Sequence, residues 1–162
     1  MQSTTPNERN QRSQKKLEQR RASKLNKLKA ELRQLAPQKA HLLPQNTITQ
    51  VSKIFSLTQG EDLGLIAQKY SFDFFLMGLI DEDALITDLG LEFLELNQSK
   101  QIKLLKTEAF KLPKMDILRR EISKKKYKSN KELVEALPED FFGNIAFQTR
   151  VVQLTNILSW IK

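Results

Sequence analysis

The clearest indication of the fold is residues 9–36, with the sequence RNQRSQKKLEQRRASKLNKLKAELRQLA. The stretch contains neither Gly nor Pro and consists mostly of Lys, Arg, Gln, Glu, Leu and Ala, which all favour helix. It predicts one long helix, which Pro37 ends or closely follows. Four leucines at 3-4-3 spacing form one stripe on that helix: Leu25, Leu28, Leu32 and Leu35. The stripe covers fewer than two heptads, so it does not by itself predict a coiled coil.

Charge is sorted along the chain rather than spread evenly. Residues 1–41 hold 11 Lys/Arg against 3 Asp/Glu, which equals the net charge of +8 of the whole chain. Residues 42–100 hold 3 against 9, residues 101–131 hold 11 against 3, and residues 132–162 hold 2 against 4. Two basic blocks therefore flank an acidic middle. A polyanion that contacts such blocks releases condensed counterions, so the pattern favours nucleic acid as a partner, although solvated helix faces give similar runs.

The chain divides into four predicted parts. Residues 1–8 are polar and are predicted to be disordered, and residues 9–41 form a basic helical arm. Residues 45–98 form an acidic module and residues 101–162 a basic one, each built from short helices, so the fold is predicted to be mainly α. Helices are predicted after a cap at Thr47 or Thr49, over 61–70, from Ser71 to Ile80, in the second half of 86–96, over 102–110 and 115–122, after a cap at Ser129, and from Asn144 to Ile161, with a loop at 97–100.

Residues 45–96 resemble a winged helix. They combine a helical trio, a turn and the string ITDLGLEFLEL at residues 86–96. Many prokaryotic winged-helix domains have an LTxxG segment where the strand of the wing gives way to the next helix, and Ile86, Thr87 and Gly90 stand at those places. The residue types suit this role, because Ile favours a strand and Gly supplies a sharp turn.

The second half of the chain resembles a helix-turn-helix. Its helices carry SNKELVEAL at residues 129–137 and FGNIAFQTRVVQLTNILSWI at residues 142–161. Together, residues 45–162 are similar to the tandem winged-helix modules of bacterial restriction-system proteins and of regulators associated with AAA-type ATPases. This resemblance implies DNA binding by two recognition helices, residues 71–80 and 144–161, and the basic arm lies outside it.

The two candidate recognition helices differ in composition. Residues 71–80 are apolar, and their one charge is Asp73, so this helix is predicted to be core or a protein interface rather than a reader of bases. The last helix offers Asn144, Gln148 and Arg150, which are suitable side chains for base edges. The same side chains would also serve as the ordinary polar side of a buried helix, and the sequence leaves both interpretations open.

A candidate site follows for each kind of contact. Base contacts are predicted for Asn144, Gln148 and Arg150, and a partner protein or second copy for the leucine stripe or for Phe72 and Phe75. Phosphate contacts are predicted for the arm and for the basic segment 111–131. Within these two segments the named residues are Arg12, Lys15, Lys16, Arg20, Arg21 and Lys24, with Lys124, Lys125, Lys126 and Lys128.

The residue inventory argues against an enzyme. The chain has no Cys and one His, His41, so thiolate chemistry, a histidine-based triad and a His-rich metal site lack their components. Neither a Gly-rich phosphate loop nor an Asp/Glu-x-Lys nuclease pattern occurs, so no cofactor is predicted. No apolar run is long enough to span a membrane.

These observations predict a cytoplasmic, nucleoid-associated regulatory or accessory protein that binds DNA, in which the acidic module serves docking or dimerisation. Two alternatives stay open. One is a protein-interaction adaptor that docks through helical surfaces, and the other is an RNA-binding protein with a basic arm.

Overall fold

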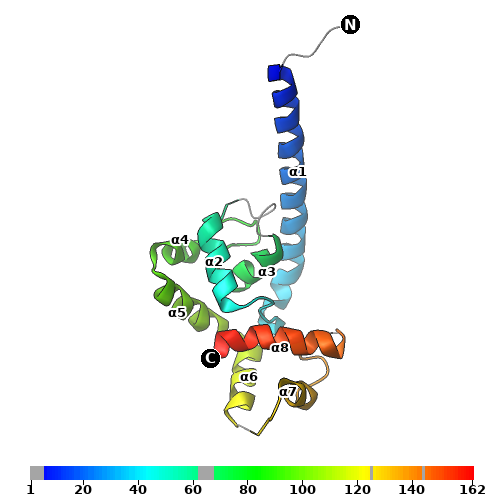
Figure 1. Cartoon of the computed structure of the whole chain (residues 1–162), viewed down its shortest axis with the longest axis vertical. Helices are drawn as coiled ribbons and strands as arrows, with labels where there is room; N and C mark the ends of the chain where they lie inside the picture. Colours follow the sequence, from blue (N-terminus) through cyan, green and yellow to red (C-terminus); the bar gives the residue numbers. More distant parts are fainter. Residues whose placement is uncertain (1–5, 62–67, 125, 144) are drawn as a thin grey trace.

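The computed structural model describes residues 6–61, 68–124, 126–143 and 145–162, and this part of the chain is mainly helical, as predicted. Figure 1 shows one long helix standing on a body of shorter helices. The elements are α1 (Pro6–Leu35), the 3-10 helix η1 (Ala36–His41), α2 (Ile48–Thr58), α3 (Gln68–Leu76), α4 (Asp88–Glu95), α5 (Gln98–Ala109), α6 (Pro113–Ser123), α7 (Asn130–Ala136) and α8 (Phe147–Ile161).

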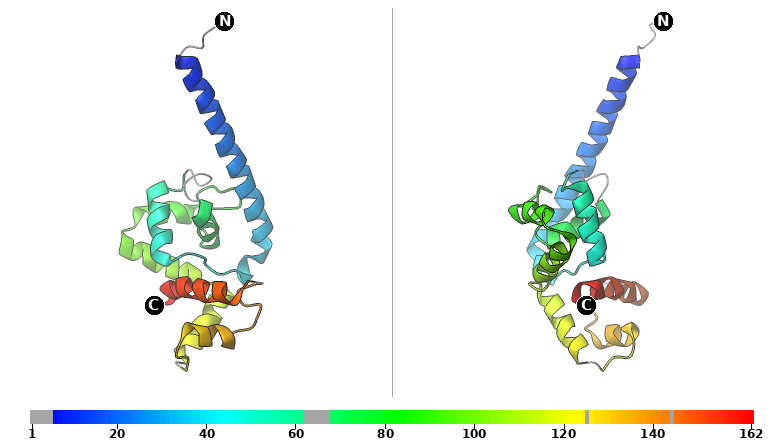
Figure 2. Two further views of the ribbon diagram at one scale, coloured as in Figure 1. Left: turned by 45° about the vertical axis from the view of Figure 1, so that its right-hand side comes forward. Right: turned by 60° about the vertical axis from the view of Figure 1, so that its left-hand side comes forward.

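Helix α1 begins earlier than the sequence predicts. Residues 6–8, predicted to be disordered, form its first turn, while residues 1–5 lie outside the described residues. Glu8 in this first turn suits the positive end of the helix dipole. The N-terminal half of α1 extends beyond the body in all three views of Figures 1 and 2, and only its C-terminal half lies beside other helices.

The leucine stripe of α1 packs within this chain. Leu28 and Leu32 are 3% and 1% exposed, Leu25 is half-buried against the same core, and α1 contacts α3. The stripe is therefore not the surface for a partner or second copy that the sequence suggested. The same correction applies to Phe75, which is buried, because α3 supplies the apolar face that α1 covers. The prediction that this apolar helix belongs to the core is confirmed.

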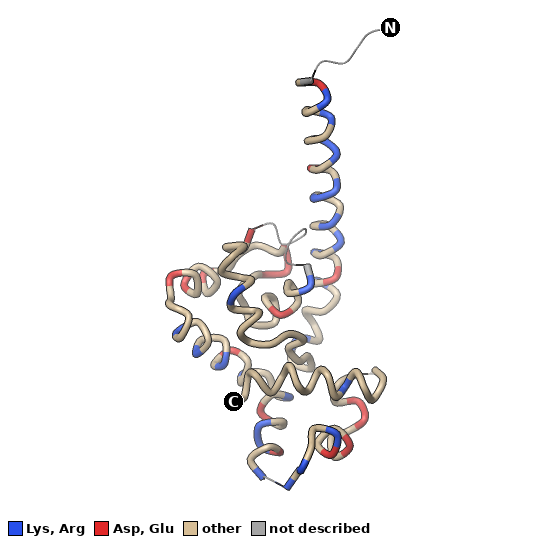
Figure 3. Tube along the Cα trace, viewed as in Figure 1, with Lys and Arg blue, Asp and Glu red and all other residues tan. Residues whose placement is uncertain are grey.

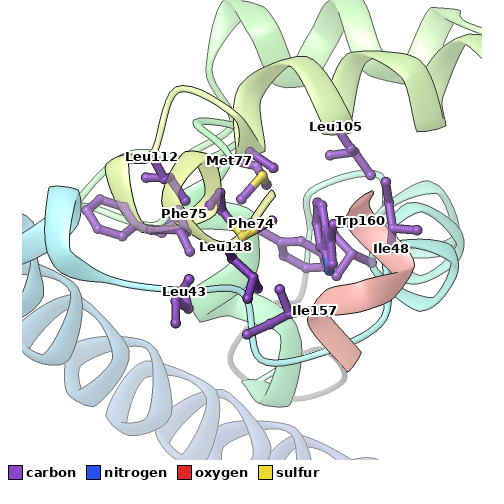
Figure 4. Packing of buried hydrophobic residues seen from close by; sticks show 14 of the residues in the cluster. Leu43, Ile48, Phe74, Phe75, Met77, Leu105, Leu112, Leu118, Ile157 and Trp160 are labelled. Carbon is purple, nitrogen blue, oxygen red and sulfur yellow. The ribbon is translucent and has the colours of Figure 1, made fainter. Parts of the chain in front are cut away.

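One continuous core joins the two predicted modules. Helix α2 packs against α3, α5 and α8, and the ring of Phe55 meets those of Phe74 and Phe93 edge to face at 4.9 and 5.4 Å. Figure 4 shows side chains from α3, α5, α6 and α8 converging in this core, among them Phe74, Leu118 and Trp160. The predicted boundary between residues 98 and 101 therefore does not separate two cores.

Hydrogen bonds attach the C-terminal helix to the segment just before α2. The indole Nε1–H of Trp160 donates to the carbonyl of Asn46 over 2.8 Å, and Ile48 donates its N–H to the hydroxyl of Ser159 over 2.9 Å. Asn156 adds a bond from its Nδ2 to the carbonyl of Gln45 at 3.0 Å. These contacts join residues more than a hundred positions apart, so the folded body depends on both ends of residues 45–162.

The turn after α3 differs from the prediction. Ser71 lies inside α3 and does not begin a helix, and the helix ends at Leu76 because Gly78 adopts a left-handed conformation, with φ of 78°. Ile80 then forms an antiparallel bridge with Ile86, which is the extent of the predicted wing in the described residues. The turn at 81–83 is polar, as predicted.

Gly90 is required for a different reason than the sequence suggested. It lies inside α4, where Thr87 caps the helix by accepting from the Gly90 N–H at 3.0 Å. A Cβ at this position would overlap the carbonyl oxygen of Leu79 and the side chain of Ile86. Gly90 therefore permits a close approach of two segments rather than a turn.

Capping signals in the sequence predicted some helix starts correctly and others incorrectly. Thr47 and Ser129 cap α2 and α7 as predicted. Asn97 caps α5, so residues 98–100, predicted to be loop, are helical. The last helix begins at Phe147 rather than at Asn144, which itself lies outside the described residues, as does most of the helix predicted over 61–70.

Candidate nucleic-acid interface

The N-terminal half of α1 is exposed on every side. Each residue from 7 to 24 is exposed, and we call this segment the projecting arm. Its apolar side chains are Leu17, which is 44% exposed, and the small Ala22. A helix that is polar on all sides has no apolar face to bury. The projecting arm therefore presents neither the apolar seam of a coiled coil nor the apolar face of a membrane-bound amphipathic helix.

Cations follow one face of the projecting arm. Their spacing along the chain is 3-4-4-4-3, which keeps them within a sector about 120° wide on an α-helix. At 1.5 Å per residue they extend over about 27 Å of helix. The set, called the cation stripe, consists of Arg9, Arg12, Lys16, Arg20, Lys24 and Lys27.

The cation stripe points away from the body. Its centre lies about 120° around the helix from the centre of the leucine stripe, which faces α3. The acidic residues Glu8 and Glu18 lie outside this sector by the same geometry. Figure 3 shows the Lys and Arg positions following α1 well beyond the body, which carries both signs of charge. A ligand along the stripe would therefore meet the arm without lying on the acidic residues of the segment 42–100.

The sequence named four members of the cation stripe as site residues and missed two. Arg9 and Lys27 complete the 3-4-4-4-3 spacing, and that spacing is the signal that could have identified them. Lys15 and Arg21, which the sequence also named, lie on the two flanks of the stripe. Among the described residues, none of Lys16, Arg20 and Lys24 lies in an ion pair.

The second basic block is arranged differently, because several of its cations are paired within their own helices. The carboxylate of Asp116 forms ion pairs with Arg119 at 2.7 Å and with Arg120 at 2.9 Å. Lys124 pairs with Glu121 at 2.8 Å. Lys111 pairs with Glu108 in the same way. In each pair the cation is exposed and the carboxylate is half-buried. A phosphate would have to compete with these carboxylates, so this block is a poorer anion site than its charge suggests.

Three further cations of this block that the sequence named as site residues lie in the turn after α6. Lys126 and Lys128 are exposed, and Lys125 lies outside the described residues. Lys126 sits over the ring of Tyr127 at 5.3 Å. The Tyr127 hydroxyl donates to Glu121 over 2.8 Å, and that hydrogen bond raises the pKa of Tyr127. The ring is therefore tied to the protein surface rather than presented for stacking on a base.

Of the predicted base-reading residues, the structure describes Gln148 and Arg150, and these two differ in exposure. Gln148 is exposed at the start of α8, and nothing is described for Asn144. Arg150 is half-buried, and its Nε donates to the carbonyl of Ile145 over 2.9 Å. The depression beside Arg150 is also lined by Glu139 and Asp140, and two carboxylates disfavour the approach of a phosphate backbone.

Comparison of this chain with protein-family models, with curated proteins and with solved structures gave no match. The described helices include none with both the length and the apolar content that a membrane span requires.

Proposed function

We propose that this protein is a DNA-binding regulatory or accessory protein that holds DNA through phosphate contacts from the cation stripe. One observation carries the proposal: the projecting arm offers a row of exposed cations and lacks an apolar face. Its partner must therefore be recognised by charge. A phosphate backbone supplies a matching row of negative charges, and release of its counterions drives the association.

The alternative of a protein-interaction adaptor is less well supported. Such an adaptor would use the leucine stripe or Phe72 and Phe75. Leu28, Leu32 and Phe75 are buried, and Phe72 is half-buried against the same core. An acidic protein on the arm would need carboxylates that match a row of cations about 27 Å long. DNA presents such a row in every sequence.

Within this proposal, the body acts as a compact winged-helix-like support. The bridge between Ile80 and Ile86, the cap at Thr87 and the close packing at Gly90 support the comparison. The body holds α1 through the leucine stripe and keeps the arm clear of the acidic segment 42–100. Exposed Lys126 and Lys128 would add phosphate contacts, and Gln148 is the described α8 residue best placed to reach a base. We place this activity in the cytoplasm, at the nucleoid.

The test is the salt dependence of DNA affinity for the full chain, measured by fluorescence anisotropy on a short duplex. Six phosphate contacts give a slope of log affinity against log salt of about −5. Replacing three members of the cation stripe should reduce the steepness of that slope by about half. The three changes are Arg12→Gln, Lys16→Gln and Arg20→Gln.

A matched control removes the same charge from the body. It carries Lys53→Gln, Lys100→Gln and Lys103→Gln, three exposed positions outside α1 and outside the proposed phosphate contacts. We expect the control to keep most of the slope. A flat salt dependence in the unmodified chain overturns the proposal, and equal losses in the two variants would mean that total charge, rather than the arm, governs binding.

A further inference from the structure

The shape of the projecting arm matches one groove of one kind of nucleic acid. An α-helix with its side chains is about 10–12 Å across, and the major groove of B-form DNA is about 12 Å wide. Residues 7–24 are exposed on all sides, so the body blocks no face of the arm over this length. The arm extends over about 27 Å, which corresponds to about 8 base pairs.

The distribution of charge around the arm also fits a groove. Lys15 and Arg21 lie about 120° from the centre of the cation stripe on opposite sides, so cations cover roughly two thirds of the circumference. Of the two acidic residues of the arm, Glu18 lies in the remaining sector, and Glu8 lies in the first turn of α1 beside the flank of Lys15. A helix resting on a flat anionic surface uses one face, whereas a helix in a groove meets phosphates on both flanks. The arm has cations for both flanks.

We propose that the projecting arm lies in the major groove of B-form duplex DNA. The cation stripe is turned toward the DNA, its long side chains reach phosphates at the borders of the groove, and Lys15 and Arg21 lie on the two flanks. This inference rests on the proposed function and narrows it to one ligand. It selects duplex DNA over single strands and over duplex RNA, for separate reasons.

Single-stranded nucleic acid lacks a suitable contact in the arm. Proteins that hold single strands stack bases on aromatic side chains, and residues 1–41 contain no Phe, Tyr or Trp. Duplex RNA presents a major groove too deep and narrow for a helix. The groove dimensions of B-form DNA are the ones that admit this arm.

The base of the arm sets how far DNA can approach the body. Glu31 follows the last member of the cation stripe on the same sector of α1, at the level where Leu28 and Leu32 are buried. Asp83 lies beside this level, because it pairs with Arg33. Negative charge therefore begins where the arm meets the body, and the duplex stops at this point.

The first experiment compares three ligands of equal length and sequence with the full chain: duplex DNA, single-stranded DNA and duplex RNA. We expect duplex DNA to bind at least about tenfold more tightly than either of the others. Failure to bind any of them overturns the proposed function as well. Equal binding to all three, with a steep salt slope, leaves the proposed function standing and overturns the groove assignment.

The second experiment identifies the groove by competition. Methyl green, which occupies the major groove, should displace the protein from duplex DNA, and netropsin, which occupies the minor groove of A·T sequences, should leave it bound. The reverse result overturns the assignment while keeping DNA binding.

A pair of single substitutions tests the orientation of the arm. Ser13→Glu places a negative charge within the sector of the cation stripe, and Gln11→Glu places the same charge on the opposite side. We expect a loss of duplex affinity of about tenfold for Ser13→Glu and of less than about threefold for Gln11→Glu. Equal losses would show that the stripe does not face the groove.

Discussion

Trp160 donates its indole N–H to the carbonyl of Asn46 over 2.8 Å, and the side chain of Asn46 in turn donates to the carboxylate of Asp73 over 2.9 Å. All three residues are buried. The contacts join three elements in one hydrogen-bonded network: α8, α3 and the segment that precedes α2. Because buried polar groups are costly when unpaired, this network fixes how the three elements meet.

Trp160→Phe should destabilise the protein by about 2–3 kcal/mol, because it leaves the Asn46 carbonyl without its donor and removes part of a fully buried side chain. The measurement is the free energy of unfolding from urea denaturation. Val152→Ala on the exposed face of α8 is the control and should change it by less than about 0.5 kcal/mol. Similar losses for the two variants would contradict the role given to the hydrogen bond.

Asp73 gives a prediction about pH. Burial raises the pKa of Asp73 to about 6, against the opposing effect of hydrogen bonds from Gln45 and Asn46. The folded state therefore holds the proton more tightly than the unfolded state does. This group's contribution to stability is greatest below about pH 4, falls between about pH 4 and 6 by on the order of 3 kcal/mol, and is constant above that range.

The Asp73 contribution can be isolated with Asp73→Asn, which cannot ionise. Across this pH range, the free energy of unfolding of the unmodified chain should decline as the pH rises. The variant should lack this decline. The variant places an amide NH₂ against a backbone donor, so it should be less stable by about 1–3 kcal/mol below about pH 4, where Asp73 is protonated. At neutral pH the variant lacks the cost of ionisation, which offsets this loss. A carboxyl titration of Asp73 by NMR gives the same pKa if the variant unfolds, and a midpoint near 4 would contradict the prediction.

Substitutions at Gly90 and Gly143 allow the effect of close packing on stability to be compared with the effect of backbone strain. Gly90→Ala should cost about 3 kcal/mol, because the new Cβ meets the rigid backbone of Leu79, and this outweighs the gain of up to about 1 kcal/mol from the better helix propensity of Ala. Gly143 has φ of 79° with open space around it, so Gly143→Ala should cost only about 1 kcal/mol. Thermal denaturation distinguishes them, and the opposite order would be inconsistent with the packing at Gly90.

We expect α1 to be held on the body by its buried leucines rather than by the ion pair between Arg33 and Asp83. Leu32→Ala should cost about 2–5 kcal/mol, as expected for a leucine that is 1% exposed. Leu17→Ala on the same helix is the matched control and should have little effect, since Leu17 is exposed. Arg33→Gln, which removes the exposed pair with Asp83, should leave the melting temperature unchanged in high salt. A larger effect for Arg33 than for Leu32 would refute this order.

Local signals in the sequence predicted local structure well. The caps at Thr47 and Ser129 depend on side chains within three residues, and the length of α1 follows from composition. The leucine periodicity also identified which face of α1 is buried. It did not identify what covers that face, because α3 lies about forty residues further along the chain and the contact is tertiary.

The candidate site shows the same division. Charge totals assign equal weight to the two basic blocks, since 11 Lys/Arg against 3 Asp/Glu occur in each. The structure distinguishes them through pairing and exposure. The pairs of Asp116 with Arg119 and Arg120 have helix spacing and were in principle readable from sequence. The half-buried position of Arg150 was not, because it depends on how the Ile145 carbonyl is placed by the loop before α8.

The projecting arm should gain helix stability when it binds DNA. The pairs Arg12 with Lys16, Lys16 with Arg20 and Arg20 with Lys24 place like charges at i,i+4 spacing, and each pair destabilises the helix by about 0.2–0.5 kcal/mol. Residues 12–24 are all exposed, so burial against the body does not compensate this repulsion. Phosphates would neutralise this repulsion.

Amide hydrogen exchange provides the measurement, with the docked half of α1 as an internal control. Amides of residues 12–24 should exchange more slowly when duplex DNA is added, while those of residues 28–35 should be unchanged, because buried leucines already hold that half. Raising the salt concentration without DNA should slow exchange in the arm slightly, since salt screens the same repulsion. Unchanged exchange throughout the arm at saturating DNA would show that the duplex binds elsewhere on the molecule.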